Sequence, residues 1–77
     1  MSKEYRDEVT TRGGNEVEVR VVEDHPEYEL KVDSQESECH WEETFQINPS
    51  KRAAGDTELL ANTLMRIGRR WALMHCP

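Results

Sequence analysis

Alternation of apolar and charged side chains with a period of two runs through the middle of this chain and constrains its fold more than any other feature. The segments EVEVRVVED (16–24) and EYELKVD (27–33) show it most clearly. The segment CHWEETFQI (39–47) shows it with one break at Glu43, which a β-bulge or a strand end open to water explains. Because successive side chains of a strand point to opposite faces, each segment predicts a β-strand with one apolar face and one charged face.

Turn-forming residues separate these segments and favour sequential hairpins within an acidic antiparallel sheet over residues 15–49. The sequence RGGN (12–15) supplies two glycines and an asparagine for a tight turn. A second turn is expected at DHP (24–26), and NPS (48–50) ends the last strand because proline has no N–H for the ladder. Residues 1–14 alternate weakly and are interpreted either as an edge strand or as a loose arm.

A helical period follows in the C-terminal third of the chain. Asp56 or Thr57 is a suitable N-cap, and a helix is predicted over residues 56–75. Its large apolar residues recur at steps of 4, 3, 4 and 3 and form one stripe: Leu60, Leu64, Ile67, Trp71 and Met74. At about 1.5 Å per residue the helix is about 27 Å long, close to the span of a strand of about eight residues. One helix can therefore cover one face of the sheet.

Together these elements predict an α+β fold: a three- or four-stranded antiparallel meander with one C-terminal helix packed on one face. With 77 residues we expect a single small domain, 1–77, near the lower limit for one apolar core. Trp41 and Trp71 are expected to be largely buried, on opposing layers. No apolar run reaches the roughly 18 residues that cross a bilayer, and the first ten residues show no secretion signal. We therefore expect a cytoplasmic protein with no membrane partner.

Two Cys-His pairs, at 39–40 and 75–76, raise the question of a zinc site, a disulfide or a catalytic thiol. Cys39 and His40 are neighbours on a predicted strand, so their side chains point to opposite faces and cannot share a metal ion or act as nucleophile and base. Cys76 lies about 160° around the helix from the apolar stripe, and a cytoplasmic protein keeps its thiols reduced. We therefore expect no metal site, no disulfide, no cofactor and no enzymatic activity.

Charge is distributed unevenly among the predicted elements, although the whole chain has a net charge of −6. Residues 1–14 are neutral overall. Residues 15–49 hold eleven carboxylates and two basic side chains, a net charge of −9, whereas residues 50–77 hold five basic and two acidic side chains, a net charge of +3. The predicted sheet is acidic and the predicted helix is basic, so an acidic protein of this kind is expected to bind a basic partner.

The charged face of the sheet is the leading candidate for a binding surface. Its acidic residues are Glu16, Glu18, Glu27, Glu29, Asp33, Glu38 and Glu42. Carboxylates two residues apart on a strand are separated by about 6.6 Å, close to two of the about 3.4 Å phosphate steps of a DNA strand. The sequence thus favours an inhibitor that blocks a basic, nucleic-acid-binding surface of a partner protein. Virus-encoded inhibitors of bacterial defence, such as anti-CRISPR proteins, are similar in size, charge and architecture, although no motif here identifies one.

Three alternatives accompany this interpretation. A sheet covered on one side routinely leaves a charged face that is only solvated. A basic helix face, comprising Arg66, Arg69 and Arg70, would serve a nucleic-acid binder, although direct nucleic-acid binding is disfavoured by the acidic sheet. The third alternative is a homodimer that acts as a structural or accessory subunit. It would form through the opposite charges of the two faces or through pairing at an exposed strand edge.

Overall fold

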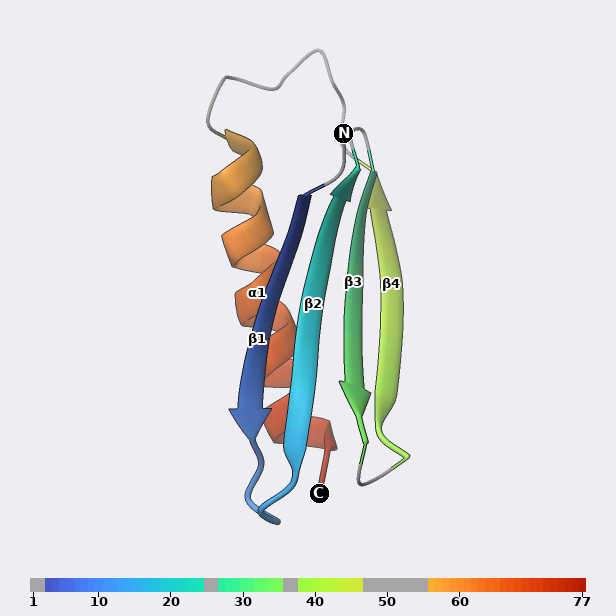
Figure 1. The fold of residues 1–77 in the computed structure, drawn as a ribbon, viewed down its shortest axis with the longest axis vertical. Coiled ribbons are helices and arrows are strands. Elements are labelled where there is room, and N and C mark those ends of the chain that lie inside the picture. Colours follow the sequence, from blue (N-terminus) through green and yellow to red (C-terminus); the bar gives the residue numbers. More distant parts are fainter. Residues whose placement is uncertain (1–2, 25–26, 36–37, 47–55) are drawn as a thin grey trace.

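Four antiparallel strands and one helix form the part of the chain that the computed structural model describes, residues 3–24, 27–35, 38–46 and 56–77. The elements are β1 (Lys3–Thr10), β2 (Glu16–Asp24), β3 (Glu27–Ser34), β4 (His40–Gln46) and α1 (Asp56–His75). The strands follow the order β1-β2-β3-β4 in one sheet, and α1 lies across one face of it (Figure 1). The predicted α+β meander with a C-terminal helix is confirmed, and the N-terminal segment forms an edge strand.

The alternating pattern divides the sheet into an inner face under α1 and an outer face open to solvent. Strand register places Val17, Val19 and Val21 of β2 beside the inner residues of β3, with Val19 opposite Val32 and Val21 opposite Leu30. These side chains are fully buried, because both neighbouring strands and the helix cover them. The core is therefore centred on the two middle strands.

Close contact between α1 and the sheet depends on small residues of the helix. Ala61, Gly68 and Ala72 are buried against the sheet. A Cβ atom at Gly68 would lie 2.6 Å from Cγ1 of Val19 and 3.0 Å from Cδ1 of Leu30, so any larger residue would push the helix outward. The absence of a side chain at Gly68 sets the distance between the two layers.

The predicted apolar stripe of the helix was therefore wrong in its orientation. Of its five residues only Leu64 is buried, Leu60 and Trp71 are half-buried, and Ile67 and Met74 are 42% and 66% exposed. The physical reason is that the stripe of small residues allows a closer approach to the sheet than the stripe of large ones. Leu64 and the neighbouring Met65 are buried beside the small residues, whereas the other large residues of the stripe lie on the flank of the helix or at its surface.

The backbone of α1 approaches β1, β2 and β3, but among the described residues it does not approach β4. Side chains cross this gap instead. The indole rings of Trp41 and Trp71 stack, with ring centroids 5.2 Å apart and an angle of 23° between planes. Both tryptophans are on opposing layers as predicted, but both are half-buried, so the expectation that they are largely buried was wrong.

The turn between β1 and β2 forms at the predicted RGGN sequence. The Thr11 N–H donates to the Asn15 carbonyl over 2.9 Å, and the Gly14 N–H donates to the Thr11 carbonyl over 3.0 Å. Gly14 has a φ of 81°, a conformation that glycine adopts without strain. The other turn and boundary predictions, at His25–Pro26 and Asn48–Ser50, lie outside the described residues.

Candidate protein-binding surface

The outer face of the sheet carries almost only polar side chains, because it contains the charged half of each alternating strand. Among the described strand residues, Val22 is the one apolar residue on this face, and it is half-buried. Its carboxylates are Glu4, Glu8, Glu16, Glu18, Asp24, Glu27, Glu29, Asp33 and Glu42. Its basic side chains are Arg6, Arg20 and Lys31, with His40 on β4. Acidic groups dominate this face, but they are not spread evenly over it.

A row of basic side chains crosses the middle of the outer face. Strand register places Arg6 opposite Arg20, and Arg20 opposite Lys31. Each cation contacts the glutamate two residues earlier on its own strand, in the pairs Arg6–Glu4, Arg20–Glu18 at 3.1 Å and Lys31–Glu29 at 2.8 Å. The contact with Glu29 raises the pKa of Lys31, and the contact with Arg6 lowers the pKa of Glu4. These pairs neutralise the centre of the face.

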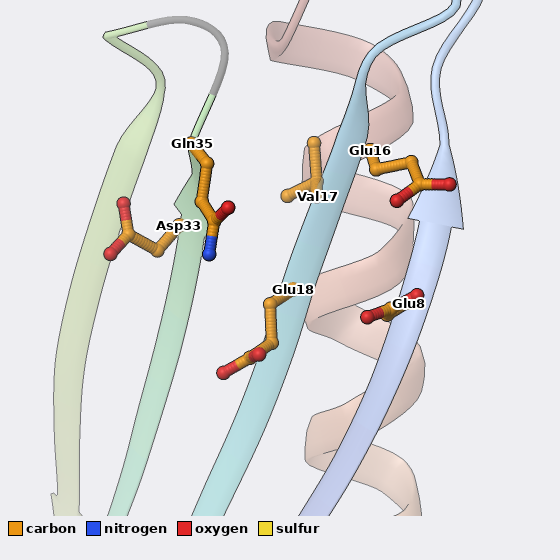
Figure 2. A pocket seen from close by; sticks show the side chains of 6 residues that line it. All are labelled: Glu8, Glu16, Val17, Glu18, Asp33 and Gln35. Carbon is orange, nitrogen blue, oxygen red and sulfur yellow. The ribbon is translucent and has the colours of Figure 1, made fainter.

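One end of the outer face remains acidic and is hollowed (Figure 2). We call it the acidic hollow, and its carboxylates are Glu8, Glu16, Glu18 and Asp33. Glu8 of β1 lies opposite Glu18 of β2, which lies opposite Asp33 of β3. The hollow has a volume of about 90 Å³, well below the several hundred Å³ of a typical small-molecule pocket. A volume of this size accommodates no more than the end of one long side chain.

The structure groups only some of the predicted binding residues. Glu16, Glu18 and Asp33 meet at the acidic hollow. Glu27 and Glu29 lie at the opposite end of the same face, where Glu27 is opposite Asp24 of β2. Glu42 lies on the outer face of β4, 3.6 Å from the His40 ring, while Glu38 precedes β4 and is not part of a strand. Five of the seven predicted residues therefore form two groups at opposite ends of the face, while Glu42 lies opposite Lys31 of the basic row and Glu38 lies outside the strands.

Glu8 belongs to the acidic hollow but was not among the predicted residues. Residues 1–14 were expected to be neutral overall, and their weak alternation did not assign side chains to either face. The signal was present, because Glu4, Arg6 and Glu8 alternate with Tyr5, Asp7 and Val9. Once residues 3–10 are a strand, Glu8 faces outward with Glu18.

The predicted basic face of the helix is divided in the structure. Arg69 reaches β1 and forms an ion pair with Asp7, whose side chain lies on the inner face of the sheet. The hydrogen bond from Arg69 lowers the pKa of Asp7. Arg66 and Arg70 are exposed on the back of the helix. Two arginines, not three, therefore face solvent away from the sheet.

The two cysteines form a disulfide, Cys39–Cys76, with a Cα–Cα distance of 5.5 Å, and the expectation of free reduced thiols was wrong. The cause is the orientation of the helix. Cys76 follows Ala72 by four residues, and its N–H donates to the Ala72 carbonyl over 2.9 Å, so it lies on the buried side of α1. The predicted angle was measured from the stripe of large residues, which does not face the sheet.

The C-terminal residue is also attached to the β1–β2 turn. The Pro77 backbone oxygen accepts hydrogen bonds from the Thr11 hydroxyl and from the Asn15 side-chain amide, the second over 3.0 Å. With the disulfide one residue earlier, the end of α1 is linked both to this turn and to the segment before β4. These links hold the sheet end that carries the acidic hollow.

Features that would indicate another kind of site are few in the described part of the chain. Within residues 3–24, 27–35, 38–46 and 56–77, no group of three or more His, Cys, Asp and Glu side chains is arranged to hold a metal ion. None of the helices that the structure describes is long and apolar enough to cross a membrane. No protein-family model, curated protein or solved structure matches the chain.

Proposed function

We propose that this protein is a binding module, not an enzyme, and that its outer sheet face occupies a basic surface of a partner protein. The observation that supports this most is the acidic hollow, which is lined by Glu8, Glu16, Glu18 and Asp33 from three strands. A lysine or arginine of the partner would place its charged end there, near these carboxylates. The remaining outer carboxylates would contact the rim of the basic surface.

The kind of basic surface follows from the spacing of the charges. Glu16 and Glu18 are two residues apart on β2, which separates their Cα atoms by about 6.6 Å, while neighbouring strands are about 4.8 Å apart. A surface that accepts phosphates at similar spacing, about 3.4 Å per step and about 6.8 Å per two steps, would accept these carboxylates. The partner in this proposal is a nucleic-acid-binding protein, and the chain is its inhibitor, in the style of anti-CRISPR proteins.

A direct nucleic-acid binder is the weaker alternative. Its basic face would be reduced to Arg66 and Arg70, because Arg69 is paired with Asp7. Specific nucleic-acid binding usually needs a larger basic patch. A phosphate backbone would also be repelled by the outer face of the sheet.

A cytoplasmic location remains a prediction, and the disulfide weighs against it. Cytoplasmic reductants normally keep thiols reduced, whereas disulfides persist in oxidising compartments. The Cys39–Cys76 bond therefore favours a protein that acts, or at least matures, where thiols are oxidised. Labelling the thiols with a maleimide reagent directly in lysed cells, before and after reduction, would determine which state the protein has in its host.

The proposed surface is tested by charge reversal combined with affinity capture. The wild-type chain is immobilised, and proteins captured from host extract are identified at low salt and at increasing salt. We expect a basic, nucleic-acid-binding protein to be retained and to dissociate as salt rises. The double variant Glu8→Lys with Glu16→Lys should lose this protein, because two cations would then face a basic surface.

Two matched variants test whether another surface of the molecule binds the partner. Glu27→Lys with Glu29→Lys makes the same charge change at the other end of the outer face, and we expect a smaller loss of binding. Arg66→Glu with Arg70→Glu changes the helix back, and we expect no loss. If the helix variant abolishes capture while the Glu8 and Glu16 variant does not, the outer face is not the binding surface and the proposal is wrong.

A further inference from the structure

The sheet has two open edges, and β1 forms one of them (Figure 1). An edge strand presents backbone N–H and C=O groups that can pair with another strand. We propose that two copies of the chain join through their β1 strands, antiparallel, in the register that places Tyr5 opposite Tyr5 of the second copy. The two sheets would then form one continuous sheet with both helices on the same face.

Symmetry fixes which residues meet in this arrangement. A two-fold axis perpendicular to the sheet at Tyr5 places residues at equal distances from Tyr5 opposite one another, on the same face. On the inner face, Lys3 of each copy lies opposite Asp7 of the other. On the outer face, Glu4 of each copy lies opposite Arg6 of the other. The sequence KEYRD, 3–7, is therefore complementary in charge to its own antiparallel copy, and each pair of opposite charges occurs twice.

Other registers of β1 are less favourable, including the axis at Asp7, which pairs Arg6 with Glu8 twice but places Asp7 opposite itself. An axis at Glu4, Arg6, Asp7 or Glu8 places that charged residue directly opposite itself, which destabilises the pair. An axis at Val9 pairs only the last three residues of the strand, 8–10, and leaves the charged pattern unpaired. Tyr5 is the one position at which an axis within the strand opposes an uncharged residue and brings opposite charges together on both sides.

The central pair adds an apolar contact to the ion pairs. Tyr5 is half-buried in one copy and lies on the inner face, beside the core. In the proposed register the two Tyr5 rings lie opposite each other between the two helices, and aromatic pairs across strands are stabilising. The ammonium group of Lys3 lies 5.1 Å from the Tyr5 ring centroid, so the cation that would pair with Asp7 of the second copy is next to the central ring.

The other edge strand, β4, does not show the same property. An axis at Glu42 or Glu43, the middle of the strand, places two glutamates opposite each other. An axis at Thr44 brings no opposite charges together, and an axis at Trp41 gives only the pair of His40 with Glu42. Charged residues on an edge strand normally prevent pairing with another chain. The charges of β4 have this effect in the registers centred on Glu42 and Glu43, whereas those of β1 attract a second copy in the register centred on Tyr5.

The proposal predicts how the dimer responds to charge reversal on β1. Arg6→Glu would place a glutamate opposite Glu4 of the second copy, twice per dimer. Within one copy the same change removes the exposed contact with Glu4 but places a carboxylate opposite Arg20 of β2, so the stability of the fold should change little. The double variant Glu4→Arg with Arg6→Glu restores opposite charges across the axis. Both residues are exposed and outside the core, which keeps the variants folded.

Sedimentation equilibrium over about 1 µM to about 1 mM protein tests this directly. We expect the wild type to form dimers, Arg6→Glu to raise the dimer dissociation constant about tenfold or more, and the double variant to return it close to the wild-type value. Arg70→Glu, an identical charge change on the exposed helix back, should leave the dissociation constant unchanged. Circular dichroism confirms that each variant is folded.

Three results would overturn the proposal: a wild type that stays monomeric over this range, a dimer that Arg6→Glu does not weaken, or open polymers in place of dimers. The last would indicate β1 of one copy pairing with β4 of the next. The dimer depends on the β1 edge alone, so it stands or fails separately from partner binding by the outer face.

Discussion

β1 and β4 are both edge strands of the same sheet, but different contacts hold them in place. β1 is approached by the backbone of α1, and its residue Asp7 forms an ion pair with Arg69 of the helix. β4 is not approached by the helix backbone among the described residues. Its links to the helix layer include one tryptophan stack and the Cys39–Cys76 disulfide, which lies next to its first residue. One edge is held by packing along the strand, and the other by long side chains and a covalent bond.

The difference follows from the small residues on the buried side of α1. Because Ala61, Gly68 and Ala72 face the sheet, the helix lies close to the middle strands and covers only three of the four. β4 lies beyond the strands that the helix covers, so only long side chains and the disulfide can connect it to the helix layer. The stability of β4 is therefore concentrated in a few contacts, whereas that of β1 is distributed.

Removing the disulfide should have the largest effect and should act mainly on β4. The bond closes a loop with a sequence separation of 37, for which chain entropy predicts a stabilisation of about 2 to 4 kcal/mol. Cys39→Ser with Cys76→Ser should lower the free energy of unfolding by this amount in a denaturant titration. Amide hydrogen exchange should then show β4 losing protection well before β1.

The wild type in the presence of a reductant provides the matched control for this substitution. It should unfold at about the same denaturant concentration as the double serine variant, and reductant should not change the variant. Equal loss of protection in β1 and β4 would show that the disulfide stabilises the whole fold uniformly, and the contrast between the two edges would not hold.

The sequence predicted the sheet well because each strand carries its own alternating signal, readable without knowledge of its neighbours. It predicted the helix equally well, but not its orientation. Both the large stripe through Leu64 and Trp71 and the small stripe through Gly68 and Ala72 fit a helical period. The choice between them depends on how closely the helix can approach Val19, which is a property of the assembled layers.

The disulfide and the acidic hollow were missed for related reasons. Placing Cys76 on the buried side required the correct helix orientation, so one error led to the other. Grouping Glu8 with Glu18 and Asp33 required the register of β1, which the weak alternation of residues 1–14 left open. In both cases the local pattern was present, and the missing information was the position of one element relative to another.

Removing the stack of Trp41 on Trp71 should have an intermediate effect on stability, and it should act on β4, the edge strand that the backbone of α1 does not approach. Stacked aromatic pairs contribute about 0.5 to 1.5 kcal/mol beyond the burial of their area. A double-mutant cycle of Trp41→Ala and Trp71→Ala should therefore give a coupling energy in this range, measured by denaturant unfolding. Both rings are half-buried, so each single change should cost less than the about 3 to 5 kcal/mol of a fully buried tryptophan. A coupling energy near zero would mean that the stack does not hold β4 to the helix.

Removing the ion pair of β1 should have the smallest effect. The Asp7 and Arg69 side chains are 39% and 42% exposed, and exposed pairs contribute at most about 1 kcal/mol. Asp7→Asn should therefore lower stability by less than about 1 kcal/mol at neutral pH. Because Arg69 lowers the pKa of folded Asp7, its contribution is present above the unfolded pKa and disappears as the pH falls through the folded pKa.

Denaturant unfolding of the wild type and of Asp7→Asn from neutral to strongly acidic pH measures this contribution. The two stabilities should converge at acidic pH, where Asp7 is protonated in the folded and in the unfolded chain. Should Asp7→Asn cost as much as the loss of the disulfide, β1 would depend on a single contact, just as β4 does. The distinction between a strand held by distributed packing and one held by a few links would then be lost.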